Sequence, residues 1–180
     1  MSKFIENEVI EIDDKVIGIV ILNSKKEKFI CKIDSEDYRR VRMFKWYMSL
    51  GYAESKAFSD TKYPLRAKLH RLIMSFPNGN LIDHINGDKL DNRKSNLRLC
   101  NKSSNGMNRG TQSNNKVGIK GVTFVRVRNK FRATIFYKKQ IHLGFFNTKE
   151  EAGNAYISAS IKYFKEFSFK DGRTLGQIDQ

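Results

Sequence analysis

The chain has 180 residues and a formal net charge of +15, with 39% hydrophobic and 12% aromatic residues. No stretch approaches the roughly 18 to 20 consecutive apolar residues of a membrane span, and the N-terminus lacks the basic start and apolar run of a signal peptide. We therefore expect an intracellular, cytoplasmic protein without a membrane partner, in which Cys31 and Cys100 are reduced and too isolated for a zinc site or a disulfide framework.

The positive charge is unevenly distributed. Residues 1–60 carry 11 basic and 11 acidic residues, residues 61–105 carry 9 and 3, and residues 106–180 carry 14 and 5. The excess therefore lies in the last two segments, which indicates a polyanion bound by them. A protein that is merely basic and soluble is the alternative interpretation of the charge alone.

The first 60 residues predict a β-rich segment. Residues 8–33 alternate apolar and polar positions, which predicts two short strands with a turn near Asn23. Residues 34–37 offer a helix cap for a short helix around Tyr38, and a second hairpin is expected around Trp46 and Tyr52. Because no catalytic constellation appears here, we assign this segment a scaffolding role or an added DNA contact.

The segment 61–108 predicts strand, long loop, strand and helix. Residues 81–84 form a short strand, the loop after it is rich in Asn, Asp and Gly, and residues 97–100 return as the second strand. Residues 102–108 follow as a short helix, for which Asn101 is a plausible cap. An irregular polar loop of this kind is typical of a ligand-holding site.

Chemistry-bearing residues concentrate in this segment. His84, one of three histidines, follows Asp83, and Asn96 and Asn105 come twelve and then nine residues later. Neighbouring side chains on a strand point apart, so Asp83 can face a metal while His84 faces a scissile phosphate as general base. Asn105 can complete a site of oxygen ligands, which suits magnesium or manganese, and Asn96 can hold the loop and orient His84.

On these residues, the segment from Leu69 to Asn108 resembles the HNH endonuclease motif, a ββα-metal fold, in its phage and intron-encoded variety. The resemblance implies His84, Asn96 and Asn105 as the lettered residues, with Asp83 and Asn105 binding one metal ion. Many relatives have histidine at the position of Asn105. No zinc-binding cysteine quartet is present, so flanking residues must support the ββα unit.

Three further positions near the motif have less specific roles. His70 lies on an apolar segment, where a structural role is favoured over a catalytic one. Arg71 and Arg98 can each grip a phosphate, although either can equally be a solvated charge.

The segment after residue 117 predicts three strands and a helix. Strand patterns cover 121–128, 130–138 and 140–146, and Thr148 with Glu151 forms a capping box that opens a helix with a stripe of small residues. One sheet face packs on this helix, and the other exposes basic and polar side chains that can lie in a DNA groove. The predicted contacts of this face and its linker are Arg109, Lys116, Lys120, Thr123, Arg126, Arg128, Arg132, Thr134, Phe136, Lys138, Gln140 and His142.

Residues 118–169 resemble the APETALA/ethylene-response-factor DNA-binding domain. The matching residues are 118–122, 130–133, 141–146 and 148–152. Plant members read DNA with arginines and tryptophans on the sheet, whereas Thr123, Phe136, Gln140 and His142 take several of those places here. The plant recognition sequence therefore does not carry over, and an unrelated three-stranded module is the alternative.

We therefore expect an α+β protein: a ββα-metal HNH unit, preceded by a small β-rich segment and followed by a three-stranded antiparallel sheet packed on one helix. The expected parts are a β-rich segment 1–60, a nuclease domain 61–108, a linker 109–117, a DNA-binding domain 118–170 and a tail 171–180.

The predicted function is a metal-dependent, site-selective endonuclease of double-stranded DNA, of the homing type found in phages and mobile elements. If the chain is phage-encoded, it acts in a bacterial host cell. We expect one magnesium or manganese ion, no small-molecule cofactor, and a monomer or weak dimer. His84 as general base leaves 5′-phosphate and 3′-hydroxyl ends. A non-catalytic DNA-binding regulator is the alternative, and an RNA-binding protein fits the charge but not the metal-type constellation.

Overall fold

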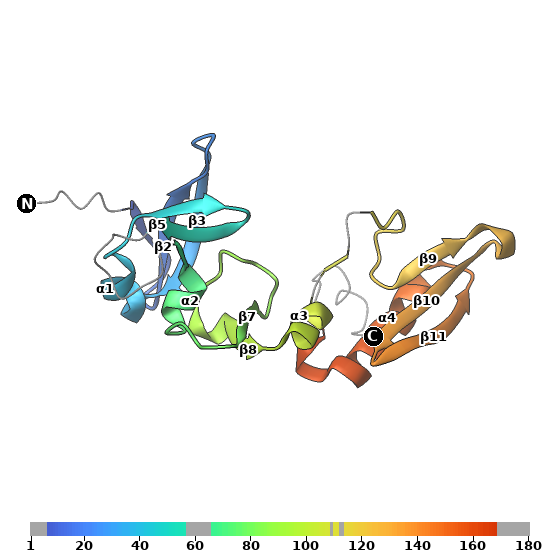
Figure 1. Cartoon of the computed structure of the whole chain (residues 1–180). Coiled ribbons are helices and arrows are strands. Elements are labelled where there is room, and N and C mark those ends of the chain that lie inside the picture. Colours follow the sequence, from blue (N-terminus) through green and yellow to red (C-terminus); the bar gives the residue numbers. More distant parts are fainter. Residues whose placement is uncertain (1–6, 57–65, 109, 112–113, 169–180) are drawn as a thin grey trace, which may run out of the picture. The chain divides into compact units, whose positions relative to one another are not determined.

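The computed structural model describes residues 7–56, 66–108, 110–111 and 114–168. Contacts divide the chain into two compact units, residues 1–101 and residues 102–180 (Figure 1). Both combine small antiparallel sheets with short helices, so the fold is mixed α/β as expected. In the described residues, no helix has both the length and the apolar character needed to cross a membrane.

The first unit contains two three-stranded antiparallel sheets and a two-stranded one. The orders are β1-β2-β3, β4-β5-β6 and β7-β8. The two hairpins predicted in the first 60 residues are confirmed, and β1 adds a strand that the sequence pattern did not separate. The elements are β1 (Val9–Glu11), β2 (Val16–Leu22), β3 (Lys28–Asp34), α1 (Tyr38–Val41), β4 (Trp46–Ser49), β5 (Tyr52–Lys56), β6 (Arg66–Lys68), α2 (Leu69–Ile73), β7 (Leu81–His84) and β8 (Leu97–Cys100).

One hydrophobic core holds this unit together. Buried side chains of β2 and β3, among them Ile21 and Ile33, pack in the same cluster as Leu69 and Leu72 of α2 and Leu97 of β8. The N-terminal sheet and the β7–β8 hairpin therefore share their apolar interior. The contacts thus divide the chain after Asn101, whereas the sequence suggested separate parts at 1–60 and 61–108. Residues outside the β7–β8 hairpin therefore support it through this core.

The edge strand β3 is also hydrogen-bonded to the loop between β7 and β8. The Lys32 amide donates to the Leu90 carbonyl at 2.8 Å, and the Asn92 amide donates to the Lys32 carbonyl at 2.8 Å. The Asp34 carboxylate accepts from the Lys94 amide at 2.7 Å and forms no side-chain cap on the helical turn that follows it, contrary to the predicted cap. Hydrogen bonds from strand β3 therefore hold the polar loop in place.

The second unit is an antiparallel sheet of order β11-β10-β9 with α4 packed on it (Figure 1). It begins with the short helix α3 (Lys102–Asn108). The predicted capping box is present: Thr148 Oγ1 accepts from the Glu151 amide, and the Glu151 carboxylate accepts from the Thr148 amide. The remaining elements are β9 (Val122–Val125), β10 (Lys130–Tyr137), β11 (Lys139–Phe146) and α4 (Lys149–Phe164).

Two details differ from the sequence-based prediction for this sheet. The first strand ends at Val125, and residues Arg126–Arg128 form a 3-10 turn closed by Asn129 in the left-handed conformation. The register of β10 with β11 also shifts between Ala133 and Thr134, which marks a β-bulge. Ala133 and Ile135 are buried against α4, as predicted from their alternation.

Gly121 provides a stability test for the second unit. It has a φ of +74°, and a Cβ there would fall onto the Tyr156 ring and lie 2.6 Å from the Thr134 carbonyl oxygen. Gly118 has a similar φ of +77°, but a Cβ there meets nothing within 4 Å. We expect Gly118→Ala to cost about 1–2 kcal/mol of backbone strain. Overpacking should add about 1–3 kcal/mol in Gly121→Ala.

Urea unfolding of both variants, followed by circular dichroism, measures these costs. Equal losses in the two variants would contradict the close approach of Gly121 to Tyr156.

Candidate active site

Asp83 and His84 occupy the end of β7 and are both buried, at 6% and 5% exposure. In the antiparallel ladder, Asp83 lies opposite Arg98 and His84 opposite Leu97. The Arg98 guanidinium donates from Nε and Nη2 to Asp83 Oδ2, at 2.9 and 2.7 Å. Arg98, predicted as a phosphate contact, is therefore engaged with the carboxylate predicted as a metal ligand.

His84 lies among aromatic rings of the first unit. The His70 ring is perpendicular to it at a centroid distance of 5.1 Å, and the Tyr52 ring lies at 6.3 Å. Burial lowers the pKa of His84 below its usual value, against the opposing effects of the Asn92 hydrogen bond and of nearby carboxylates. The imidazole is therefore neutral at neutral pH, which is the form that can accept a proton.

His70 on α2 is a second buried histidine in contact with the first. Burial lowers its pKa to about 3, and the positive charges of nearby groups act in the same direction. Its ring also lies 5.5 Å from the Tyr52 ring. His70 thus packs as a neutral ring between Tyr52 and His84.

Asn92 holds the other side of the His84 ring. Its side chain is buried, at 1% exposure, and its Oδ1 lies 3.3 Å from His84 Nε2. Its Nδ2 donates to Cys31 Sγ at 3.0 Å and to the Lys89 carbonyl at 3.3 Å. The carbonyl can only accept, so the amide nitrogen must face it and the amide oxygen must face His84. His84 therefore carries its proton on Nε2, which leaves Nδ1 unprotonated.

Asn96 fastens the loop between the two strands. Its Oδ1 accepts from the Asn86 amide at 3.0 Å, and its Nδ2 donates to Asn86 Oδ1 at 2.9 Å and to the Asp91 carbonyl at 2.8 Å. Burial acts to raise the pKa of Asp91, but the Arg93 guanidinium holds that pKa below its usual value. Several hydrogen bonds thus cross-link the loop. Asn92, rather than Asn96, lies within hydrogen-bond distance of His84 Nε2.

The residues predicted to bind a metal lie in different units. Asp83 belongs to the first unit, whereas Asn105 is a half-buried residue of α3 in the second. Within the described residues, no group of three or more His, Cys, Asp and Glu side chains could hold a metal ion. The two predicted ligands are hard oxygen donors of the type that magnesium accepts, so their chemistry fits such an ion. Their joint ligation stays a prediction.

Arg71, the other arginine predicted to grip phosphate near the motif, bonds to backbone. It donates to the Pro77 carbonyl at 3.1 Å and to the Asn80 carbonyl at 3.5 Å. These bonds connect the end of α2 to the turn before β7. Arg71 is therefore engaged in local structure.

The sheet face of the second unit that points away from α4 is basic and aromatic. Thr123, Arg132, Gln140 and His142 are exposed, and Phe136 is 70% exposed. Of the other predicted contacts, Thr134 is half-buried, Arg126 and Arg128 lie in the turn after β9, Lys116 and Lys138 are exposed, and Arg109 lies outside the described residues.

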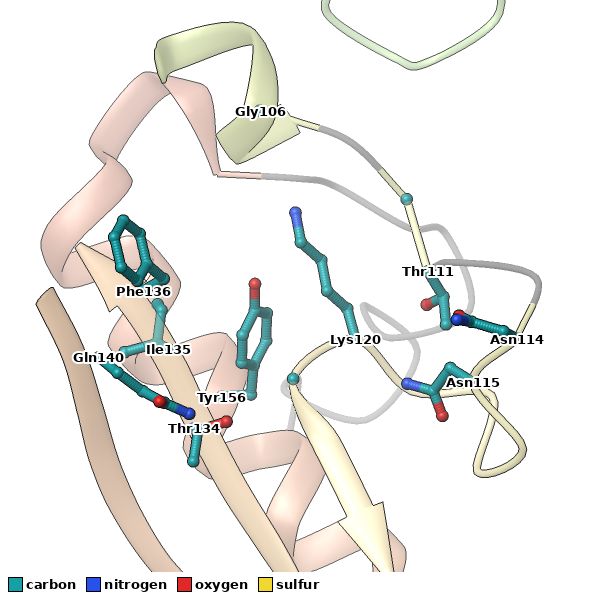
Figure 2. Close-up of a pocket in the computed structure, with 12 residues that line it drawn as sticks. Gly106, Thr111, Asn114, Asn115, Lys120, Thr134, Ile135, Phe136, Gln140 and Tyr156 are labelled. Atoms are coloured by element: carbon teal, nitrogen blue, oxygen red, sulfur yellow. The ribbon is translucent and has the colours of Figure 1, made fainter. Parts of the chain in front are cut away.

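A pocket lies at one end of this sheet (Figure 2). Lys120, Thr134, Phe136 and Gln140 line it together with Tyr156 of α4. Lys120 Nζ donates to the Met107 carbonyl at 2.7 Å, so this predicted contact also ties α3 to the sheet. Four of the predicted contacts therefore converge on one concave surface.

Phe145 belongs to the outward face but was missed by the sequence pattern. It lies opposite Arg132, its ring is 4.8 Å from the His142 ring, and the Arg128 guanidinium stacks on it at 4.5 Å. Strict alternation after His142 would place Gly144 on this face. The bulge at Ala133/Thr134 moves Phe145 to this face instead. A glycine in a strand can indicate a bulge, and Gly144, whose φ is +144°, is the residue of the sequence that could have indicated this one.

The short antiparallel hairpin thus presents an Asp-His pair beside a polar, cross-linked loop, as the sequence-based prediction of a nuclease site requires. Comparison with known proteins agrees: residues 67–107 match the HNH endonuclease family. The chain is 28% identical over 163 residues to "Uncharacterized HNH endonuclease L560" of Acanthamoeba polyphaga mimivirus, which covers 86% of this chain and 81% of that protein.

A second relative is "Protein 3.8" of Escherichia phage T7, 35% identical over 66 residues. That match covers 37% of this chain and about half, 54%, of the phage protein. No solved structure matches the chain significantly. Residues 67–107 therefore carry an HNH endonuclease domain, and the protein is a nuclease, for which the family implies DNA as substrate. The resemblance of residues 118–169 to a plant DNA-binding domain stays a prediction.

The pKa of His70 leads to a test by pH. The folded pKa is about 3 and the unfolded value is about 6.5, so the unfolded state binds the extra proton between these values. Stability is therefore fully present above about pH 6.5 and falls as the pH decreases, by up to about 1.4 kcal/mol per unit. We expect His70→Leu to flatten this slope in the first unit. The pKa of His84 shifts the same way, so some slope should remain.

Urea unfolding followed by the fluorescence of Trp46 checks this between pH 7 and pH 4.5. Trp46 is the one tryptophan of the chain and lies in the core of the first unit. A variant with the wild-type slope would contradict a neutral, buried His70.

Proposed function

We propose that the protein is a metal-dependent, site-selective endonuclease of double-stranded DNA, of the homing type. The observation that carries the proposal is the neutral His84 ring, held between Asn92 and His70 directly after Asp83 on the hairpin. A non-catalytic DNA-binding regulator would have no use for this arrangement. We keep the regulator as the alternative outcome of the test.

In the proposed mechanism His84 acts as general base. Its Nε2–H donates to Asn92, so Nδ1 accepts the proton of a water molecule whose oxygen attacks phosphorus. The bond from phosphorus to the 3′ oxygen breaks as the new P–O bond forms, and the 3′ oxygen takes up a proton from solvent. The products are 5′-phosphate and 3′-hydroxyl ends.

Asp83 and Asn105 are the proposed ligands of one magnesium or manganese ion. Such an ion would supply charge stabilisation for the phosphate oxygens and the departing 3′ oxygen. The Arg98 guanidinium, 2.7 Å from Asp83 Oδ2, helps to orient the buried carboxylate. Arg98 is therefore a positioning residue for Asp83 in this scheme rather than a DNA contact.

The second unit is the proposed DNA reader. Its outward sheet face carries no acidic residue at the positions named above, and its arginines alternate with Phe136, Phe145 and His142. Long basic side chains next to aromatic rings can contact both phosphates and base edges in a groove. Site selection would thus come from a unit other than the one that carries His84.

Cleavage by the His84→Ala variant is the first test of this function. We expect wild type to convert supercoiled plasmid to open-circle or linear DNA with magnesium and not with chelator. Loss of the general base should lower the rate by roughly 10²- to 10⁴-fold with DNA binding almost unchanged. Equal cleavage rates in the variant and wild type would contradict the role of His84 as general base. Tight binding by wild type without cleavage of any tested DNA would favour the regulator.

Asn92 can be tested as a positioning residue for His84. Asn92→Asp keeps an acceptor opposite Nε2, whereas Asn92→Leu has similar size and no acceptor. If the acceptor sets the tautomer and ring orientation, Asn92→Leu should lower kcat about 10- to 100-fold at unchanged KM. Asn92→Asp should retain more activity than Asn92→Leu. If Asn92 only fills the core, the leucine variant should be the more active of the two.

A further inference from the structure

Two lysines and a tyrosine gather beside His84 from three separate elements. Tyr52 lies on β5, Lys68 at the end of β6, and Lys89 in the loop five residues after His84. Lys68 Nζ is 4.1 Å and Lys89 Nζ is 4.5 Å from the centre of the Tyr52 ring. The Tyr52 ring is in turn 6.3 Å from the His84 ring. Both ammonium groups thus contact a ring that itself lies near the proposed general base.

The charge of these two lysines is not balanced within the described residues. Three other cations of the first unit are paired with carboxylates: Arg98 with Asp83, Arg93 with Asp91, and Lys94 with Glu36. In the part of the chain that the structure describes, no carboxylate forms an ion pair with Lys68 or Lys89. Two like charges that share one aromatic ring repel each other, and an anion between or beside them would relieve that repulsion.

The side chain of Lys89 lies within contact distance of the turn at Gly51. Gly51 precedes Tyr52 and has a φ of +83°, and a Cβ there would lie 3.4 Å from Lys89 Cδ. The aliphatic stem of Lys89 therefore lies along the turn between β4 and β5, which directs its ammonium group to the ring. The hairpin of residues 46–56 thus contributes to the active-site surface, although the sequence showed no catalytic constellation there.

We propose that Lys68 and Lys89, ordered by the Tyr52 ring, bind a backbone phosphate of the DNA next to the one that is cut. The proposal rests on the proposed nuclease function. Arg71 and Arg98, the arginines expected from the sequence to grip phosphate here, are engaged by backbone carbonyls and by Asp83. Lys68 and Lys89 therefore supply positive charge that these two arginines do not.

Lysine-to-glutamine variants test the site. The set is Lys68→Gln, Lys89→Gln and the double variant, with Lys25→Gln as a matched control. Lys25 is an exposed lysine in the turn between β2 and β3, so its substitution removes the same charge from the same unit. Lys68→Arg and Lys89→Arg keep the charge and should restore binding. The unfolding midpoint by Trp46 fluorescence shows that each variant is folded.

The probe is a labelled duplex oligonucleotide taken from plasmid DNA, titrated with chelator present at several concentrations of potassium chloride. If the pair neutralises one phosphate, the slope of log K against log salt should fall by about 0.9 in the double variant. The Lys25→Gln control should keep the wild-type slope. Substitution of both lysines should also raise KM in plasmid cleavage, with a smaller effect on kcat.

The outcomes separate this inference from the function on which it rests. A double variant with the slope and KM of Lys25→Gln overturns the lysine site, even if wild type cleaves DNA. A wild type that binds but never cleaves overturns the nuclease mechanism, even if the slope falls in the double variant. Loss of stability in the glutamine variants with no change in slope would assign the lysines to the support of Tyr52, which also overturns the site.

Discussion

The side-chain amide of Asn92 is the contact on which the first unit depends. It is fully buried, it reaches Cys31 of β3 with its nitrogen, and it reaches His84 of β7 with its oxygen. The backbone of the same residue is hydrogen-bonded to Lys32. A buried amide costs free energy unless its donors and acceptor are satisfied, so its three partners fix one arrangement of sheet, loop and hairpin. The N-terminal sheet is thereby coupled to the orientation of the proposed base.

Local pattern predicted the elements of the fold better than their association. The alternation of residues 8–33 predicted two strands, and Thr148 with Glu151 predicted the start of α4 at the observed residue. The shared core of the first unit depends on contacts between β2 and α2, which are some 50 residues apart, and no periodicity encodes such a pairing. For the same reason the dependence of the loop on β3 could not be expected from sequence.

The candidate site likewise contains residues that the sequence pattern identified and residues that only tertiary packing identifies. Asp83 and His84 were recognised because a carboxylate and an imidazole are adjacent in the sequence, and the structure places both on strand β7. Asn92 lies among several asparagines of one loop, and the contact of its side chain with the His84 ring, which the sequence does not show, distinguishes it from Asn86 and Asn96. Lys68 and Tyr52 lie outside the motif, so their place beside His84 follows from the packing of β5 and β6. A bulge, unseen in the alternation, likewise moved Phe145 to the outward sheet face.

Charge compensation bears on how the proposed active-site surface would attract DNA despite its acidic residues. The carboxylates of Asp83 and Asp91 are each matched by an arginine, with N–O distances of 2.7 Å in both pairs. Such compact pairs contribute little net field beyond their own neighbourhood, because opposite charges at short range cancel at a distance. Within the described residues, Lys68 and Lys89 form no ion pair with a carboxylate, so their charges are not cancelled in this way. On this argument the arginines of the hairpin preserve the geometry of the site, and the lysines around Tyr52 provide its attraction for phosphate.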